Sequence, residues 1–136
     1  MFEPAELRLT DALRRACEAA LQRLVNETSG VTAAVVVTSD GCEVASVLPS
    51  EASAPKLAAM TSSIHALGEA VVAEALLRRC QNVVIEAETG NVVMLAIPES
   101  QGTLLLTVIA SKRAILGHLL WSCRTCTTSI SYWLKP

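Results

Sequence analysis

Residues 31–38, with the sequence VTAAVVVT, form a β-branched run whose odd and even positions are both apolar. Successive side chains of a strand point to opposite faces of a sheet, so a strand of this kind must be covered on both faces. We therefore expect residues 31–38 to be a central strand with helices packed on either side of it. This single run already favours a three-layer α/β/α arrangement over a sheet with one face in water.

The remaining elements follow from periodicity and from turn residues. Asp40-Gly41 predicts a tight hairpin with a type I′ turn after the first strand. The short links at Thr89-Gly90 and at 98–102 favour antiparallel pairing of the later strands. Ser53 or Ala54 is expected to cap the middle helix, and Ser111 the last one. The predicted helices are 5–27, 55–79 and 111–134, and the predicted strands are 31–38, 42–48, 82–88, 91–97 and 103–110.

The predicted fold is thus α/β (α+β): a five-stranded antiparallel sheet in the order αββαβββα, forming one domain over residues 1–136.

The helix predicted for 55–79 has two sides that both lack charge. We expect its larger apolar stripe to lie on the sheet; this stripe is Leu57, Met60, Ile64, Leu67, Val71 and Ala75. The roughly opposite side carries small residues where a surface helix would carry Lys and Glu; it comprises Ala59, Ser62, Ala66, Ala70, Ala73 and Leu77. Small residues allow two helices to approach closely, so this second side is interpreted as a homodimer interface. The alternative is that the alanines are there only as good helix formers.

The strand predicted for 82–88 is expected at an edge of the sheet. Glu86 and Glu88 make it less apolar than its neighbours. An open edge has to be paired, covered or charged, and the same edge of a second copy can pair with it across a two-fold axis. Val83 and Ile85 are therefore added to the predicted dimer interface.

Composition excludes several classes of function. The net charge of −2 and the pI near 5.7 argue against nucleic acid as a partner. No stretch approaches the ~18 apolar residues of a membrane span, and the first residues lack the apolar core of a signal peptide, so a cytoplasmic protein is expected. The chain is 51% hydrophobic and only 18% charged, which favours an oligomer.

No motif indicates catalysis, a cofactor or a metal. Cysteine catalysis requires a thiol beside a base, and the two histidines, His65 and His118, both fall within predicted helices. Cys123 and Cys126 form a C-x-x-C, but well inside a helix and without further ligands at metal-binding spacing. The chain is accordingly predicted not to be an enzyme. A zinc or thiol-redox role for Cys123 and Cys126 stays open as an alternative.

Taken in order, several segments resemble the roadblock family of dynein light-chain proteins and their bacterial relatives. They are VVVTSDGCEVAS, KLAAMTSSIHALGEAVV, NVVIEAETGNVVMLAI and TLLLTVIA, followed by Leu116-Gly117. The resemblance implies a profilin-like sheet with the middle helix on one face and the terminal helices on the other. It also implies homodimers built from antiparallel middle helices and paired third strands.

Roadblock dimers typically act as scaffolds or regulators of small Ras-like GTPases, so the resemblance implies such a partner here. The candidate GTPase contacts are His65, Glu69, Val72 and Leu76 on the outer part of the paired helices. A sensory or ligand-binding module is a second reading, because profilin-like sheets resemble small sensor domains. That reading requires a pocket with convergent polar groups, and the core strands offer few.

Overall fold

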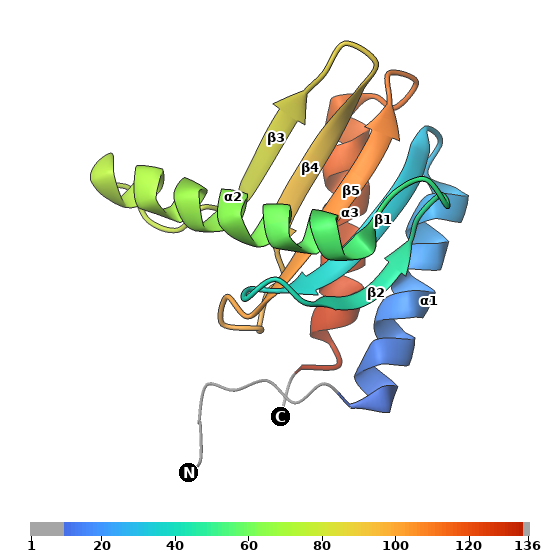
Figure 1. Cartoon of the computed structure of the whole chain (residues 1–136), viewed down its shortest axis with the longest axis horizontal. Helices are drawn as coiled ribbons and strands as arrows, with labels where there is room; N and C mark the ends of the chain where they lie inside the picture. The colour runs from blue at the N-terminus through green and yellow to red at the C-terminus, as the bar shows by residue number, and fades with distance from the viewer. Residues whose placement is uncertain (1–9, 135–136) are drawn as a thin grey trace.

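The computed structural model describes residues 10–134 and has the expected element order (Figure 1). The elements are α1 (Asp11–Glu27), β1 (Val31–Thr38), β2 (Glu43–Val47), α2 (Ala54–Glu74), β3 (Asn82–Glu86), β4 (Gly90–Ala96), β5 (Leu104–Ser111) and α3 (Leu116–Ser131).

The five strands form one antiparallel sheet in the spatial order β2-β1-β5-β4-β3. β1 lies inside the sheet, as predicted, and pairs along its length with β5, from Val31 opposite Ala110 to Thr38 opposite Leu104. β3 lies at one edge of the sheet, also as predicted. The sequence rule that a doubly apolar strand needs cover on both faces therefore identified an interior strand correctly.

Helices cover both faces of the sheet, which makes the fold three-layered (Figure 1). α1 and α3 pack together on one face over the larger core, whose most buried members include Leu21, Val36, Leu106, Leu119 and Ile130. α2 lies on the other face over a much smaller cluster of Val35, Val37, Ala58 and Leu105. The three-layer α/β/α prediction is confirmed.

The first hairpin differs in its turn from the prediction. Gly41 has φ +96°, but Asp40 is not among the residues with positive φ, and a type I′ turn needs both. Instead the Gly41 amide donates to the Thr38 carbonyl at 3.0 Å, and the Thr38 amide donates to the Cys42 carbonyl at 2.7 Å. The loop therefore has three residues with the glycine in the left-handed position, and the register of β1 and β2 shifts beside it.

The helix boundaries also differ. Thr10 caps α1 by accepting a hydrogen bond from the Leu13 amide at 3.1 Å, and the predicted helical residues 5–9 lie outside the described part of the chain. Ser53 caps α2 as expected, but α2 ends at Glu74, because Leu76 has φ +63°. Ser111 is the last residue of β5 and not the cap of α3, which begins at Leu116.

The side of α2 that faces the sheet was predicted wrongly. Met60, Leu67, Val71 and Ala75 are exposed, and Leu57 and Ile64 are only half-buried. The buried residues are instead small or polar: Ala58, Thr61 and His65. The difference arises because α2 lies very close to the sheet. A side chain on Gly68 would bring its Cβ within 3.0 Å of the Cys80 Sγ, and the hydroxyls of Thr61 on α2 and Thr107 on β5 are 2.7 Å apart. The small residues thus let α2 approach its own sheet, and larger apolar residues turn outward.

Candidate functional site

The side of α2 turned away from the sheet is apolar and uncovered. We call it the α2 outer face; it consists of Ala59, Met60, Ser63, Ala66, Leu67, Ala70 and Val71, all exposed. Met60 is 56% exposed and Leu67 is 66% exposed. The charged residues at this side, Lys56 and Glu74, stand only at its two ends. An uncharged face of this length on a surface helix is typical of an interaction site.

The open edge of β3 lies beside this face. β3 is the last strand of the sheet, and α2 extends past it (Figure 1). Val84 packs into the larger core, whereas Ile85, on the alternate side of the strand, is 39% exposed. The α2 outer face and the β3 edge are therefore both available to one partner.

Most of the predicted dimer residues lie on these two features. Ala59, Ala66 and Ala70 belong to the α2 outer face, and Val83 and Ile85 lie on β3; Ala73 is an exposed residue of α2 outside that face. Leu77 is exposed but lies beyond the end of α2. Ser62 is the exception, since it is half-buried and its hydroxyl donates to the Ser39 carbonyl at 2.7 Å. That these residues contact a second chain stays a prediction.

Two of the four candidate GTPase contacts do not lie on the outer surface. His65 is only 8% exposed and lies on the side of α2 that faces the sheet. Glu69 is half-buried, and its Oε1 accepts a hydrogen bond from the Cys80 amide at 2.6 Å. Both follow Thr61 at helical spacing on the side that approaches the sheet, which is why their predicted outward position was wrong. Val72 is half-buried, and Leu76 is 91% exposed.

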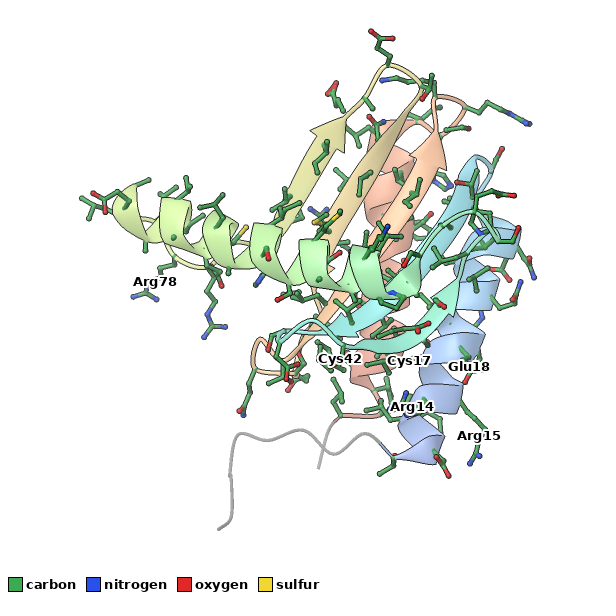
Figure 2. All side chains as sticks on the ribbon, in the orientation of Figure 1. Arg14, Arg15, Cys17, Glu18, Cys42 and Arg78 are labelled. Atoms are coloured by element: carbon green, nitrogen blue, oxygen red, sulfur yellow. The ribbon has the colours of Figure 1, made fainter. Side chains whose placement is uncertain are left out.

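The segment that follows α2 stands clear of the sheet. Leu76 and Leu77 are both exposed, and Arg78 lies below the free end of α2 in this view and points away from the molecule (Figure 2). Large apolar residues at such a position favour contact with another protein. Of the four candidate contacts, Leu76 is the one best placed for this.

His65 and Glu69 instead line a cavity of about 500 Å³, together with Cys80 and the loop between β4 and β5. Sequence reasoning missed this site and looked for convergent polar groups only in the core strands. The cavity is assembled from three segments that are distant in the sequence, so no local motif indicates it.

The cysteines are mostly buried, three of them in the α1/α3 layer. Burial raises the pKa of Cys17 to about 11 and the pKa of Cys123 and Cys126 to about 12. Cys42, at the β1–β2 hairpin, is exposed (Figure 2). Within residues 10–134, no group of three or more His, Cys, Asp or Glu residues is arranged to hold a metal ion.

No helix in the described range is long and apolar enough to cross a membrane. These features define a small three-layer α/β/α domain whose middle helix and edge strand are uncovered on one side. Its sequence over residues 18–110 matches the Roadblock/LC7 domain, and the chain belongs to this family.

Solved structures have the same fold at low sequence identity. MglB of Myxococcus xanthus is 16% identical, with a TM-score of 0.83 over 96% of this chain and 98% of that one. The gliding protein MglB of Thermus thermophilus is 19% identical, with a TM-score of 0.79 over 96% of both chains. Profilin II of Acanthamoeba castellanii is 13% identical, with a TM-score of 0.50 over 86% of this chain and 95% of that one, so the fold is profilin-like. No curated protein matches the sequence significantly.

Proposed function

We propose that this chain forms a homodimer that binds a small Ras-like GTPase and regulates its nucleotide cycle or its location. The dimer acts in the cytoplasm as a regulator or scaffold and has no catalytic residues of its own. The observation that carries the proposal is the uncharged α2 outer face beside the open β3 edge. Two such surfaces related by a two-fold axis bury each other's apolar residues and pair both strand edges.

Family membership and fold support this proposal. The chain is a Roadblock/LC7 domain, and its resemblance to that family implies a dimeric regulator of Ras-like GTPases. One MglB structure, 20% identical to this chain, has a tetrameric arrangement, so a protein of this fold does assemble. We assign the GTPase contact to Leu76, because it stays exposed beyond the helix end.

The homodimer is tested by size-exclusion chromatography with light scattering. We expect the wild-type mass to be that of two chains, and Ala70→Glu to give a single-chain mass, because it places a charge within the α2 outer face. Ala19→Glu, the same change at an exposed position of α1, is the matched control and should leave the dimer intact. A single-chain wild-type mass at micromolar concentration contradicts the homodimer.

The GTPase contact is tested separately. Ras-like GTPases encoded in the same genome are loaded with GDP or a GTP analogue and titrated against the dimer, and GTP hydrolysis is followed with and without it. Leu76→Glu should weaken binding while the two-chain mass is retained. If no GTPase binds the intact dimer in either nucleotide state, the GTPase function is wrong, whatever the oligomeric state.

A further inference from the structure

The cavity beneath α2 is separate from the surfaces assigned to dimer and GTPase contacts. It has a volume of about 500 Å³ and lies between α2, the segment that leads into β3, and the loop joining β4 to β5. Its polar lining comes from all three: His65 and Glu69, then Arg79 and Cys80, then Glu99 and Gln101. The volume is within the range of roughly 300–1,000 Å³ that small-molecule sites occupy.

The first sign of a ligand is an unpaired imidazole. His65 is 92% buried, since 8% of it is exposed, and it lines the cavity. Its Nε2 is shielded from solvent and has no hydrogen-bond partner among the described residues. Buried polar atoms are nearly always paired, because an unpaired one loses its hydration without compensation. In this structure the nitrogen is closed off from the cavity, so the His65 ring has to turn before a ligand or an ordered water there can supply the missing partner.

The second sign is the backbone around the cavity. Four described residues other than glycine have positive φ, and three of them line this site: Arg79 at +44°, Glu99 at +68° and Gln101 at +56°. Such conformations are costly and cluster where a binding site requires them. Here hydrogen bonds hold both segments, from the Cys80 amide to Glu69 at 2.6 Å and from the Ser100 hydroxyl to the Ile97 carbonyl at 2.6 Å.

The charges of the lining indicate which ligand it would accept. Glu69 is half-buried and lies one helical turn from His65, whereas Glu99 and Arg79 are exposed. The inner part of the cavity therefore offers a carboxylate and an imidazole nitrogen, which accept hydrogen bonds from an ammonium or guanidinium group. The carboxylate disfavours an anion there. At the exposed rim Arg79 and Glu99 carry opposite charges and add no net charge, so the rim accepts a neutral far end, or an anionic one that pairs with Arg79.

We propose that this cavity binds a small organic cation: a primary amine or guanidinium compound whose far end is neutral or anionic. Its charged head donates hydrogen bonds to Glu69 and to the His65 imidazole. The site depends neither on dimerisation nor on a GTPase, so it can fail or hold independently of the proposed function. It provides the pocket with convergent polar groups that a sensory module of this fold would need.

The chain offers an internally controlled test, because it has two histidines and only His65 lines the cavity; His118 lies on α3. The ring signals of both are followed by proton–carbon NMR on the full chain during titration with 4-guanidinobutyrate or butylguanidine. We expect a saturable shift of the His65 signal and no shift of the His118 signal. Glutarate, which has no cationic head, should act more weakly.

Glu69→Gln removes the charge but keeps an oxygen that can accept from the Cys80 amide. It should weaken binding about tenfold or more, since hydrogen bonds to charged groups are the stronger ones. Glu88→Gln, at an exposed position outside the cavity, is the matched control and should bind as wild type does. An unchanged His118 signal verifies that each variant is folded.

Three results would overturn the proposal. The His65 signal could fail to shift with both guanidinium probes, which would assign the cavity to water alone. Glutarate could shift it more strongly than the guanidinium probes, which would make the site an anion site. Glu69→Gln could bind the probes as tightly as Glu88→Gln does, which would place the cationic head elsewhere.

Discussion

At the scale of single residues, burial rather than sequence context determines what the five cysteines can do. Cys17, Cys80, Cys123 and Cys126 are buried, and Cys42 alone is exposed. The C-x-x-C spacing of Cys123 and Cys126 suggests reactivity, but both thiols lie inside the α1/α3 layer, where burial raises their pKa to about 12. Burial and the nearby Glu69 also raise the pKa of Cys80.

We therefore predict that the native protein has one fast-reacting thiol. With an aromatic disulfide reagent near pH 8, Cys42 should react quickly and the other four cysteines only slowly. The thiolate is the reactive form, and the four buried cysteines have little thiolate and are shielded from the reagent. Cys42→Ser should remove the fast phase, and denaturant should expose all remaining thiols. A second fast thiol in the Cys42→Ser variant would contradict this.

At the scale of elements, two loops on the α1/α3 side are tied together at Gly30. The Ser111 amide donates to the Gly30 carbonyl at 2.8 Å, which joins the α1–β1 turn to the end of β5. Gly30 has φ +92°, and a Cβ on it would lie 2.7 Å from the Ala114 backbone nitrogen. Both the backbone conformation and the close approach require glycine at this position.

Gly30→Ala should accordingly lower the free energy of unfolding by about 2 kcal/mol or more, combining backbone strain with a clash against main chain. Gly117→Ala is the matched control: a Cβ there meets nothing within 4 Å, and the residue is helical. It should be neutral or stabilise by up to about 1 kcal/mol. Urea unfolding of both variants measures the difference, and equal stability of the two would disprove the argument.

The elements also indicate how far the sequence could predict this fold. β1 was predicted to the residue, because a doubly apolar run bounded by Gly30 and Ser39-Asp40 has few other interpretations. For α2, helical periodicity revealed two uncharged sides, but the residues that face the sheet, Ala58, Thr61 and His65, belong to neither of them. Close packing decided that, through Gly68 and Thr61, and it depends on the sheet surface and not on the helix sequence.

The candidate sites were predictable to different degrees for the same reason. The uncharged outward face of α2 was visible in the sequence, since missing charges on a surface helix are a local signal. The cavity was not, because His65, Cys80 and Gln101 converge only when α2 and two loops are placed in space. His65 itself was predicted on the wrong surface, as a consequence of the same error about α2.

At the scale of the whole molecule, the terminal helices are joined partly through thiols. Cys17 of α1 and Cys123 and Cys126 of α3 lie in one core, and the Cys126 Sγ approaches the Ala20 carbonyl at 3.8 Å. Burial raises each pKa above the ordinary thiol value of 9.0. The folded chain therefore keeps protons that the unfolded chain loses as the pH passes about 9.

Stability should consequently fall in alkaline solution. The contribution of these thiols is fully present below about pH 9 and is lost as the pH rises through about 11 to 12. Between about pH 8 and about pH 10 we expect a loss of about 1 kcal/mol for each thiol. Urea unfolding measures it, and Cys123→Ala should show a smaller loss between the two pH values than wild type. An equal loss would assign the alkaline sensitivity to other groups.

The placement of the two outermost helices has a practical consequence for anyone handling this molecule. α1 starts and α3 finishes at the same end of one layer, on the far side of the sheet from α2 (Figure 1). A dye, an affinity handle or a surface tether attached at Thr10 or Leu134 therefore leaves the α2 outer face unobstructed. Immobilised this way, each copy presents the same side to whatever flows past, which suits kinetic measurements of a captured partner.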